Sequence, residues 1–362
     1  MKAFFLSDDL TGQGPVWLNI LWPLRQVFAE SFETTDLAIP PPLPGQNHWI
    51  RRARDRRLAA SRRHHWQEQV RRVTGEEETL LFVVGASPRN VEWSRLLAPV
   101  WDRFSHKVLH ICEALPPGSL DRAWLEKFDL VTCFCGDLTR DYADATSRPV
   151  LFWPAHVDSL RYHSTGAHRP VDMIVVGRRH SEMHLPLHRH FNRVGGDRIY
   201  LDFVTRTQGP RPCAEEFELL MATYRKSAAA FCYDASGLPR FEGRSPLTAR
   251  WLQAWAAGCT VFGRAPTGRG VAELTDWPEA MIELEDDPAL AIEQVETILS
   301  DSAGMAERRW RNVLETVRRH DTRARLALLL DALGAAHPPG LQRGLEAVDA
   351  LGERLATSGP GP

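Results

Sequence analysis

The sequence predicts an α/β fold of two Rossmann-like, doubly wound domains, and three observations carry this prediction. Short apolar runs recur along the chain, helical stretches separate them, and the same pattern begins again after Pro154. Uninterrupted apolar runs are typical of parallel strands that are buried on both faces. A length of 362 residues suits two domains better than one core. We expect domains at residues 1–155 and 156–335 that face each other across a cleft, then a C-terminal helix and a disordered tail over 336–362.

The first domain is predicted to open with a strand, a glycine-bearing loop and a helix. The strand covers residues 3–6, the loop carries Gly12 and Gly14, and residues 16–29 have apolar side chains at helical spacing. The prolines of residues 40–44 indicate an irregular loop. Further buried strands are expected at 79–85, 108–112, 130–135 and 150–153, with helices at 91–104 and around 120–127.

Residues 51–73 are dense in arginine and have helical propensity. One interpretation is a surface for an anionic partner or a membrane. The interpretation we favour is a solvated helix whose Leu58, Trp66 and Val70 face the domain, because acidic and other polar residues interrupt the basic run.

The second domain repeats the alternation of strand and helix. Strands are expected at 173–177, 199–204, 228–233, 260–263 and 281–283. Helices are expected at 181–194, 217–227, 246–257, 288–299, 306–319 and 322–333. Ligands of such folds bind beyond the carboxyl ends of the strands, so we look for the site there.

Composition excludes several classes of protein. Hydrophobic residues make up 43% of the chain, charged residues make up 25%, and the formal net charge of −2 gives no general attraction to nucleic acid. The six cysteines form no CxxC pair, which argues against a zinc site or a disulfide framework. We find no signal peptide and no apolar run that could cross a bilayer, and we expect a soluble, cytoplasmic protein without a nucleic-acid partner.

Two nucleotide-binding fingerprints are missing. After the first strand, Gly12 and Gly14 match the start of G-x-G-x-x-G, but Trp17 stands where the third glycine belongs. A nicotinamide enzyme is therefore disfavoured. No glycine-lysine-serine or glycine-lysine-threonine run occurs, so there is no P-loop.

The most informative segment is residues 241–261, which read FEGRSPLTARWLQAWAAGCTV. A polar loop leads into a helix, with Ser245 expected as the N-cap and Pro246 at the first helical position. The free N–H groups and the positive end of the helix dipole suit a diphosphate.

This segment resembles the donor-binding segment of GT-B glycosyltransferases, especially the family-4-like and spore-maturation CgeB-like groups. Four further segments, in the same order as in the family, support the resemblance: residues 154–158 (PAHVD), 172–179 (DMIVVGRR), 267–274 (TGRGVAEL) and 320–325 (HDTRAR). The resemblance implies an enzyme that moves a sugar from a nucleoside-diphosphate donor, such as a UDP-, GDP- or dTDP-sugar, to an unknown acceptor. It implies that no metal or other cofactor is required, and a family-4-like enzyme retains the configuration of the sugar.

The resemblance also implies roles for particular residues. Arg178 or Arg179, with Arg244, would neutralise the leaving diphosphate, since a guanidinium stays charged and offers a planar set of donors. The donor would be held by Gly12, Gly14, Arg178, Arg244, Ser245, Thr248 and Glu273.

A base for the acceptor is expected on the first domain. Glu113 follows a strand, so its carboxylate should lie at the carboxyl edge of the sheet, and we take it as the catalytic candidate. Asp8 and Asp9 are the rivals because they end the first strand.

The chain departs from the family at one acidic pair. The two glutamates of the family-4 segment fall on Ser245 and Gln253, so it is open whether a carboxylate holds the ribose; Glu273 is the substitute available. The alternatives are a nucleotide-sugar epimerase and a non-catalytic binding or scaffold protein derived from a glycosyltransferase.

The histidines at positions 180, 184, 188 and 190 invite a metal interpretation. The first three are spaced by four residues on one predicted helix, but no acid-supported ligand pattern accompanies them. We interpret them as a histidine-rich helix surface and predict no metal site.

Overall fold

The computed structural model describes residues 1–12, 20–41, 48–73, 77–180, 182–203 and 211–360. The chain forms two compact units. Unit 1 contains Met1–Gly14, Arg25–Pro154 and Ala327–Gln342, and unit 2 contains Pro15–Leu24, Ala155–Leu326 and Arg343–Pro362. Three helices therefore carry residues of both units: α1 (Leu21–Ser31), α13 (Thr322–Leu333) and α14 (Pro339–Ser358).

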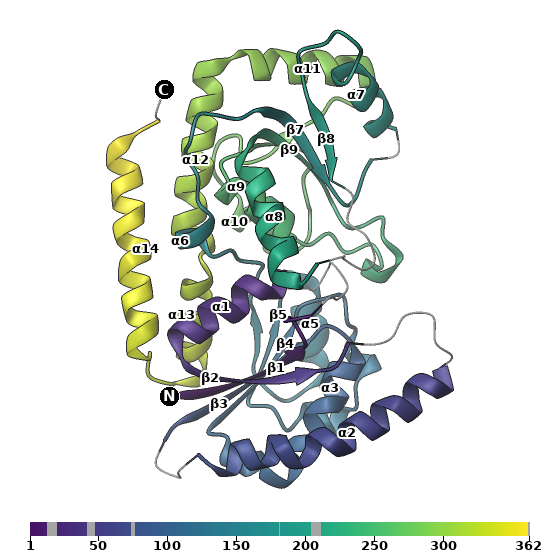
Figure 1. Cartoon of the computed structure of the whole chain (residues 1–362), viewed down its shortest axis with the longest axis vertical. Helices are drawn as coiled ribbons and strands as arrows, with labels where there is room; N and C mark the ends of the chain where they lie inside the picture. The colour runs from purple at the N-terminus through teal and green to yellow at the C-terminus, as the bar shows by residue number, and fades with distance from the viewer. Residues whose placement is uncertain (13–19, 42–47, 74–76, 181, 204–210, 361–362) are drawn as a thin grey trace. The chain divides into compact units, whose positions relative to one another are not determined.

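Unit 1 contains a six-stranded parallel sheet with the order β2-β1-β3-β4-β5-β6 (Figure 1). The strands are β1 (Lys2–Asp8), β2 (Glu33–Ile39), β3 (Thr79–Gly85), β4 (His106–Ile111), β5 (Leu130–Cys133) and β6 (Val150–Phe152). All seven residues of β3 are buried, which explains its uninterrupted apolar sequence. The predicted α/β class and the strands of this unit that we expected are confirmed.

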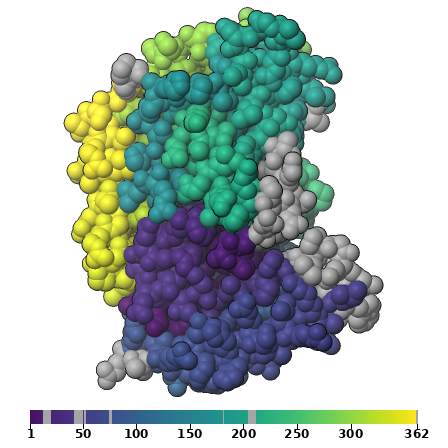
Figure 2. Space-filling model, viewed as in Figure 1, coloured from purple at the N-terminus to yellow at the C-terminus, as the bar shows by residue number. Residues whose placement is uncertain are grey.

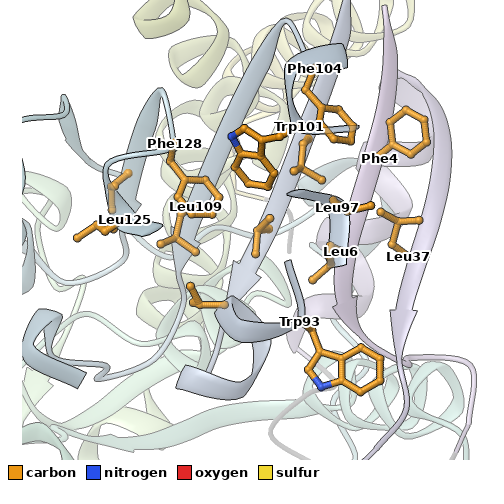
Figure 3. Close-up of a cluster of buried hydrophobic side chains, with 14 of the residues drawn as sticks. Phe4, Leu6, Leu37, Trp93, Leu97, Trp101, Phe104, Leu109, Leu125 and Phe128 are labelled. Carbon is orange, nitrogen blue, oxygen red and sulfur yellow. The ribbon is translucent and has the colours of Figure 1, made fainter. Parts of the chain in front are cut away.

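Helices and short 3₁₀ helices connect these strands. They are α2 (His48–Arg71), α3 (Pro88–Ser94), η2 (Arg95–Arg103), η3 (Pro117–Ser119), α4 (Arg122–Leu125) and α5 (Gly136–Ala145). Side chains of α3 and η2, among them Trp93 and Trp101, belong to one buried cluster with Phe4 and Leu6 of β1 (Figure 3). This cluster closes one face of the sheet.

Sequence analysis was wrong about three features of unit 1. Strand β2 was missed because its sequence, ETTDLAI, has few apolar residues, as suits an edge strand. Helix α5 was also missed. The helix expected at 91–104 is divided into α3 and η2, because Pro99 removes a backbone donor inside it.

Unit 2 contains a five-stranded parallel sheet with the order β11-β10-β9-β7-β8. The strands are β7 (Val171–Val176), β8 (Tyr200–Phe203), β9 (Ser227–Tyr233), β10 (Thr260–Arg264) and β11 (Ile282–Glu283). The helices are α6 (Ser159–Tyr162), α7 (His184–Phe191), α8 (Cys213–Arg225), η4 (Pro239–Phe241), α9 (Ala249–Ala256), α10 (Val271–Leu274), α11 (Pro288–Ser300) and α12 (Ser302–His320). The predicted second doubly wound domain is confirmed.

Within the described residues, no helix is both long and apolar enough to span a bilayer. The six cysteines are buried and form no disulfide.

Candidate active site

The candidate site in unit 2 lies where β7 and β9 end and α9 begins. Arg178 follows β7, and its Nη2 donates to the Thr248 hydroxyl at 3.4 Å. Its Nε is buried and has no hydrogen-bond partner in the described part of the chain. Burial, followed by the positive charges of Arg250 and Arg240, lowers the pKa of Arg178 to about 10. The guanidinium groups of Arg250 and Arg240 therefore both act on the charge of Arg178.

One carboxylate opposes this repulsion. Asp234, the residue after β9, favours the charged form of Arg178. Its oxygens, however, already accept hydrogen bonds from the backbone N–H and the hydroxyl of Ser236. An anion placed among the arginines would receive a donor at the Arg178 Nε and would offset their repulsion.

Helix α9 begins three residues later than the sequence predicted. The predicted N-cap Ser245 and first helical residue Pro246 are wrong, because the helix starts at Ala249 and Thr248 is its N-cap. Thr248 makes no side-chain capping bond, so its hydroxyl is left to accept from Arg178. The positive end of α9 therefore lies beside the guanidinium of Arg178.

Ser245 instead ties two loops together. Its buried hydroxyl accepts from the Thr267 N–H at 2.9 Å, and its carbonyl accepts from the Gly268 N–H at 2.8 Å. This link brings the loop before α9 to the glycine-bearing loop after β10. Arg244 lies next to it and donates to Glu242 at 2.8 Å.

Glu242 and Gly243 are both left-handed, with φ of 51° and 82°. A glutamate in this conformation carries backbone strain, which is typical of loops with a function. Glu273, predicted as a donor contact, is exposed on α10.

A small, partly open pocket lies at the same edge of the sheet and includes His180, two residues after Arg178. It is lined by His180, Met183, Tyr233, Gly263, Arg264, Leu284, Glu285 and Asp286. The His180 and Tyr233 rings lie 5.4 Å apart, and the His180 Nδ1 and the Tyr233 hydroxyl are buried without a partner in the described residues. Two rings and two polar atoms that lack partners suit a flat heterocycle.

Gly263 is required at this pocket. Its φ is +144°, and a Cβ there would lie 1.8 Å from the Cys232 carbonyl oxygen. Sequence analysis missed the pocket because it placed His180 on a helix with His184 and His188, whereas α7 begins at His184 and His180 precedes it.

The remaining histidines contact protein side chains. His184 Nδ1 lies 3.1 Å from the Tyr200 hydroxyl, and His190 Nε2 lies 2.7 Å from Glu296. No cluster of three or more metal-binding side chains occurs in the described ranges.

In unit 1 the acidic candidates gather at the carboxyl edge of the sheet. Asp8 is buried and accepts from the Asn90 amide at 2.8 Å and from Arg89 at 3.4 Å. Burial raises the pKa of Asp8, and these two partners partly offset the rise. Glu113 lies two residues after β4; burial, followed by the negative charges of Glu113 and Asp8, raises the pKa of the Cys112 thiol.

Three other predicted residues, Asp9, Gly12 and Gly14, belong to the first loop. Asp9 accepts from the backbone N–H and the hydroxyl of Thr11 and so forms a turn. Gly12 has open space around it among the described residues, and Gly14 lies outside the described residues. The structure thus places Arg178, Arg244, Ser245, Thr248 and Glu273 in unit 2, and Glu113 and Gly12 in unit 1.

Comparison with known proteins gives matches only among solved structures. No protein-family model and no curated protein matches the chain. An α-glucosyltransferase in complex with UDP and a mismatched DNA matches with a TM-score of 0.57 at 12% identity, over 92% of this chain and 99% of that one. Anabaena Alr3699/HepE in complex with UDP and glucose matches with a TM-score of 0.54 at 12% identity, over the same shares. AviGT4, a glycosyltransferase involved in avilamycin A biosynthesis, matches with a TM-score of 0.50 at 10% identity, over 92% and 97%.

Likeness at this level of identity concerns the fold. The family-4-like and CgeB-like grouping stays a prediction. The chain has two parallel sheets, and the matched structures cover 92% of it. The protein therefore has the GT-B fold of these glycosyltransferases.

Proposed function

We propose that the protein is a glycosyltransferase that takes its sugar from a nucleoside-diphosphate donor bound to unit 2. The observation that carries the proposal is the group of Arg178, Arg240 and Arg250 at the start of α9, with a buried Arg178 Nε that lacks a partner in the described chain. A diphosphate would bring further negative charge to this group and an acceptor to the Arg178 Nε. The solved structures of the same fold that contain UDP support the choice of donor.

The arginines would also assist the reaction. As the bond between sugar and diphosphate breaks, negative charge grows on the leaving phosphate, and fixed guanidinium groups stabilise it without a metal. Arg244 would approach the same phosphates from its strained loop. We further propose that the sugar keeps its configuration, that Thr248, Ser245 and Glu273 border the donor, and that the acceptor binds over unit 1 near Glu113.

The pocket beside Tyr233 and His180 would take the base of the nucleotide. Its two rings can contact a flat base, and their buried polar atoms can bond its edge. Because Tyr233 and Asp234 are consecutive, a base in the pocket and a phosphate at Arg178 are compatible with one ligand.

Thermal denaturation with UDP, GDP, dTDP, CDP and NAD, each with and without EDTA, tests the donor site. A ligand at 100 times its Kd adds about 2.7 kcal/mol, which raises the Tm by several degrees. We expect one diphosphate to raise the Tm and EDTA to leave that shift intact. A shift with NAD alone, or with none of the diphosphates, contradicts the proposal.

An activity assay then distinguishes a glycosyltransferase from an epimerase and from a non-catalytic binding protein. The donor that binds is incubated with a panel of glycan and small-molecule acceptors, and products are analysed by mass spectrometry and NMR. Transfer with an α-linked donor giving an α-linked product is the expected result. Isomerised donor without acceptor would indicate an epimerase, and binding without any product would indicate a non-catalytic protein that lost the acidic pair at Ser245 and Gln253.

A further inference from the structure

The pocket at the ends of β9, β10 and β11 is bordered by acidic side chains. Glu285 and Asp286 line it from the segment that joins β11 to α11, and both are exposed. Figures 1 and 2 show α11, which begins after this segment, at the surface of unit 2. Because the pocket is small and partly open, a base that lies against the rings of His180 and Tyr233 has an edge beside these carboxylates.

The two carboxylates differ in the partners that they have. Asp286 accepts from the Arg264 Nη2 at 2.6 Å, so its charge is already paired. The backbone N–H of Glu285 donates to the Gln294 side chain at 3.2 Å, which fixes its place in the loop. The Glu285 carboxylate itself forms no hydrogen bond and no ion pair with another residue of the described ranges. It can therefore accept hydrogen bonds from a ligand.

The buried end of the pocket offers hydrogen-bond donors. Tyr233 is 8% exposed, and its hydroxyl lacks a partner in the described part of the chain. Burial, followed by the nearby Cys232, raises the pKa of this hydroxyl, so it keeps its proton and can donate. The buried Nδ1 of His180 can donate in one tautomer. A ligand with acceptors along one edge and donors along the other would complement this pocket.

We propose that the pocket selects guanine, so that the donor of the reaction is a GDP-sugar. The inference rests on the proposed function, because it specifies the base of the nucleotide bound to unit 2. Guanine presents its N1–H and its N2 amino group side by side, and the Glu285 carboxylate can accept from both. On the same base, O6 and N7 are acceptors for the Tyr233 hydroxyl and for His180.

The other bases suit a carboxylate less well. Uracil and thymine have a single N3–H between two carbonyl oxygens, and a carboxylate repels these oxygens. Adenine and cytosine offer one amino group next to an unprotonated ring nitrogen, whose lone pair also faces the carboxylate unfavourably. Glu285 would therefore favour guanine through two hydrogen bonds and disfavour its competitors through repulsion.

Calorimetric titration of the full-length protein with GDP, IDP (inosine diphosphate), ADP and UDP tests the proposal. These ligands share the ribose and the diphosphate, and IDP differs from GDP only in lacking the N2 amino group. We expect the lowest Kd for GDP, a Kd about tenfold higher for IDP, and higher values still for ADP and UDP, as the loss of charge-assisted hydrogen bonds predicts. In Glu285→Gln the Kd for GDP should rise about tenfold, and the difference between GDP and IDP should largely disappear.

Glu283→Gln is the matched control. Glu283 is exposed, lies two residues before Glu285 and does not line the pocket. It accepts from the Ala265 N–H at 3.4 Å, which a glutamine oxygen can also do, so this variant should keep the wild-type Kd for all four nucleotides. A Kd for UDP or ADP at or below that for GDP, or an equal effect of the two variants, would overturn the guanine assignment and leave the diphosphate site standing. Failure of all four nucleotides to bind would contradict the proposed function as well.

Discussion

Two charged clusters of the molecule differ in the charges that they bring together. In the first, Arg323 lies 2.8 Å from Asp158 and 3.5 Å from Asp321, and all three side chains are buried in unit 2. In the second, Arg178 is surrounded by like charges and keeps a buried Nε without a partner in the described residues. The first cluster brings a cation to two carboxylates and serves the fold, although the Asp158 Oδ2 is also buried without a hydrogen-bond partner in the described residues. The second brings like charges together, and an anionic ligand would lower their repulsion.

The Asp8 cluster of unit 1 resembles the Arg323 cluster, because its carboxylates are paired with donors of the protein. Arg89 and Asn90 supply donors to Asp8, and Asp55 supplies a second carboxylate to Arg89. Asp8 is therefore the weaker candidate for an acceptor base, and Glu113 keeps that proposed role. Variants that change ligand binding or stability test whether the two clusters differ in this way.

Removal of Arg323 should give the largest effect on stability. Arg323→Ala leaves Asp158 and Asp321 buried without their cation, and breaking a buried pair in this way costs about 3–5 kcal/mol. Chemical denaturation should show the loss, while the fraction that remains folded should bind the nucleotide within about threefold of the wild-type Kd. A fall in affinity at unchanged stability would assign Arg323 to the ligand site.

Arg178→Ala should weaken ligand binding and leave the stability of the fold intact. Hydrogen bonds to a charged group contribute about 1.5–3 kcal/mol, so the Kd for the nucleoside diphosphate should rise about 10- to 150-fold. Because the pKa of Arg178 is lowered in the folded state, its charge opposes folding, and the variant should keep or raise the Tm. Isothermal titration calorimetry and a melting curve check the two halves of this prediction.

Arg179→Ala is the matched control for Arg178. Arg179 is the next residue in the chain, but it is exposed and pairs with Asp202. Its removal should change the Kd by less than about threefold, since exposed ion pairs contribute little. If the two variants behave alike, the difference we draw between neighbouring arginines is wrong.

Asp8→Asn tests unit 1 through pH. Burial raises the folded pKa of Asp8 above 3.8, so the folded state takes up a proton before the unfolded state does. As the pH falls towards 4, the wild type should gain stability relative to the variant, because its folded state binds a proton more readily than its unfolded state does. Urea denaturation of both proteins at pH 7 and pH 4 measures the difference. A change of opposite sign would mean that Arg89 outweighs burial.

The sequence predicted the sheets better than the site. Strands such as β3 are buried on both faces, so their sequences are apolar throughout and could be recognised as strands. Strand β2 is at an edge and has no such pattern. Arg178 and Thr248 were predicted separately, but their contact joins residues 70 positions apart, and no local pattern reports it.

The start of α9 was also mispredicted because of a contact between residues that are distant in the sequence. Ser245 and Pro246 are typical of a helix start, but Ser245 bonds the Thr267 N–H instead, a tertiary contact that outweighs the local preference. The pocket was missed for a related reason. His180 was assigned to a helix by its spacing from His184, while its ring lies by Tyr233 from a distant strand.

Tyr233→Phe should give a modest effect on ligand binding and is the sharpest test of the pocket. The substitution keeps the ring beside His180 and removes only the hydroxyl. That hydroxyl is buried and has no partner among the described residues, so its removal should leave the Tm unchanged or raise it slightly. If the hydroxyl bonds the base, the Kd for the nucleotide should rise about fivefold, as expected for a neutral hydrogen bond of about 1 kcal/mol, and the Kd for inorganic pyrophosphate should not change. An equal rise for both ligands would place the hydroxyl at the phosphates, and no rise for either would remove the base from this pocket while leaving the arginine site standing.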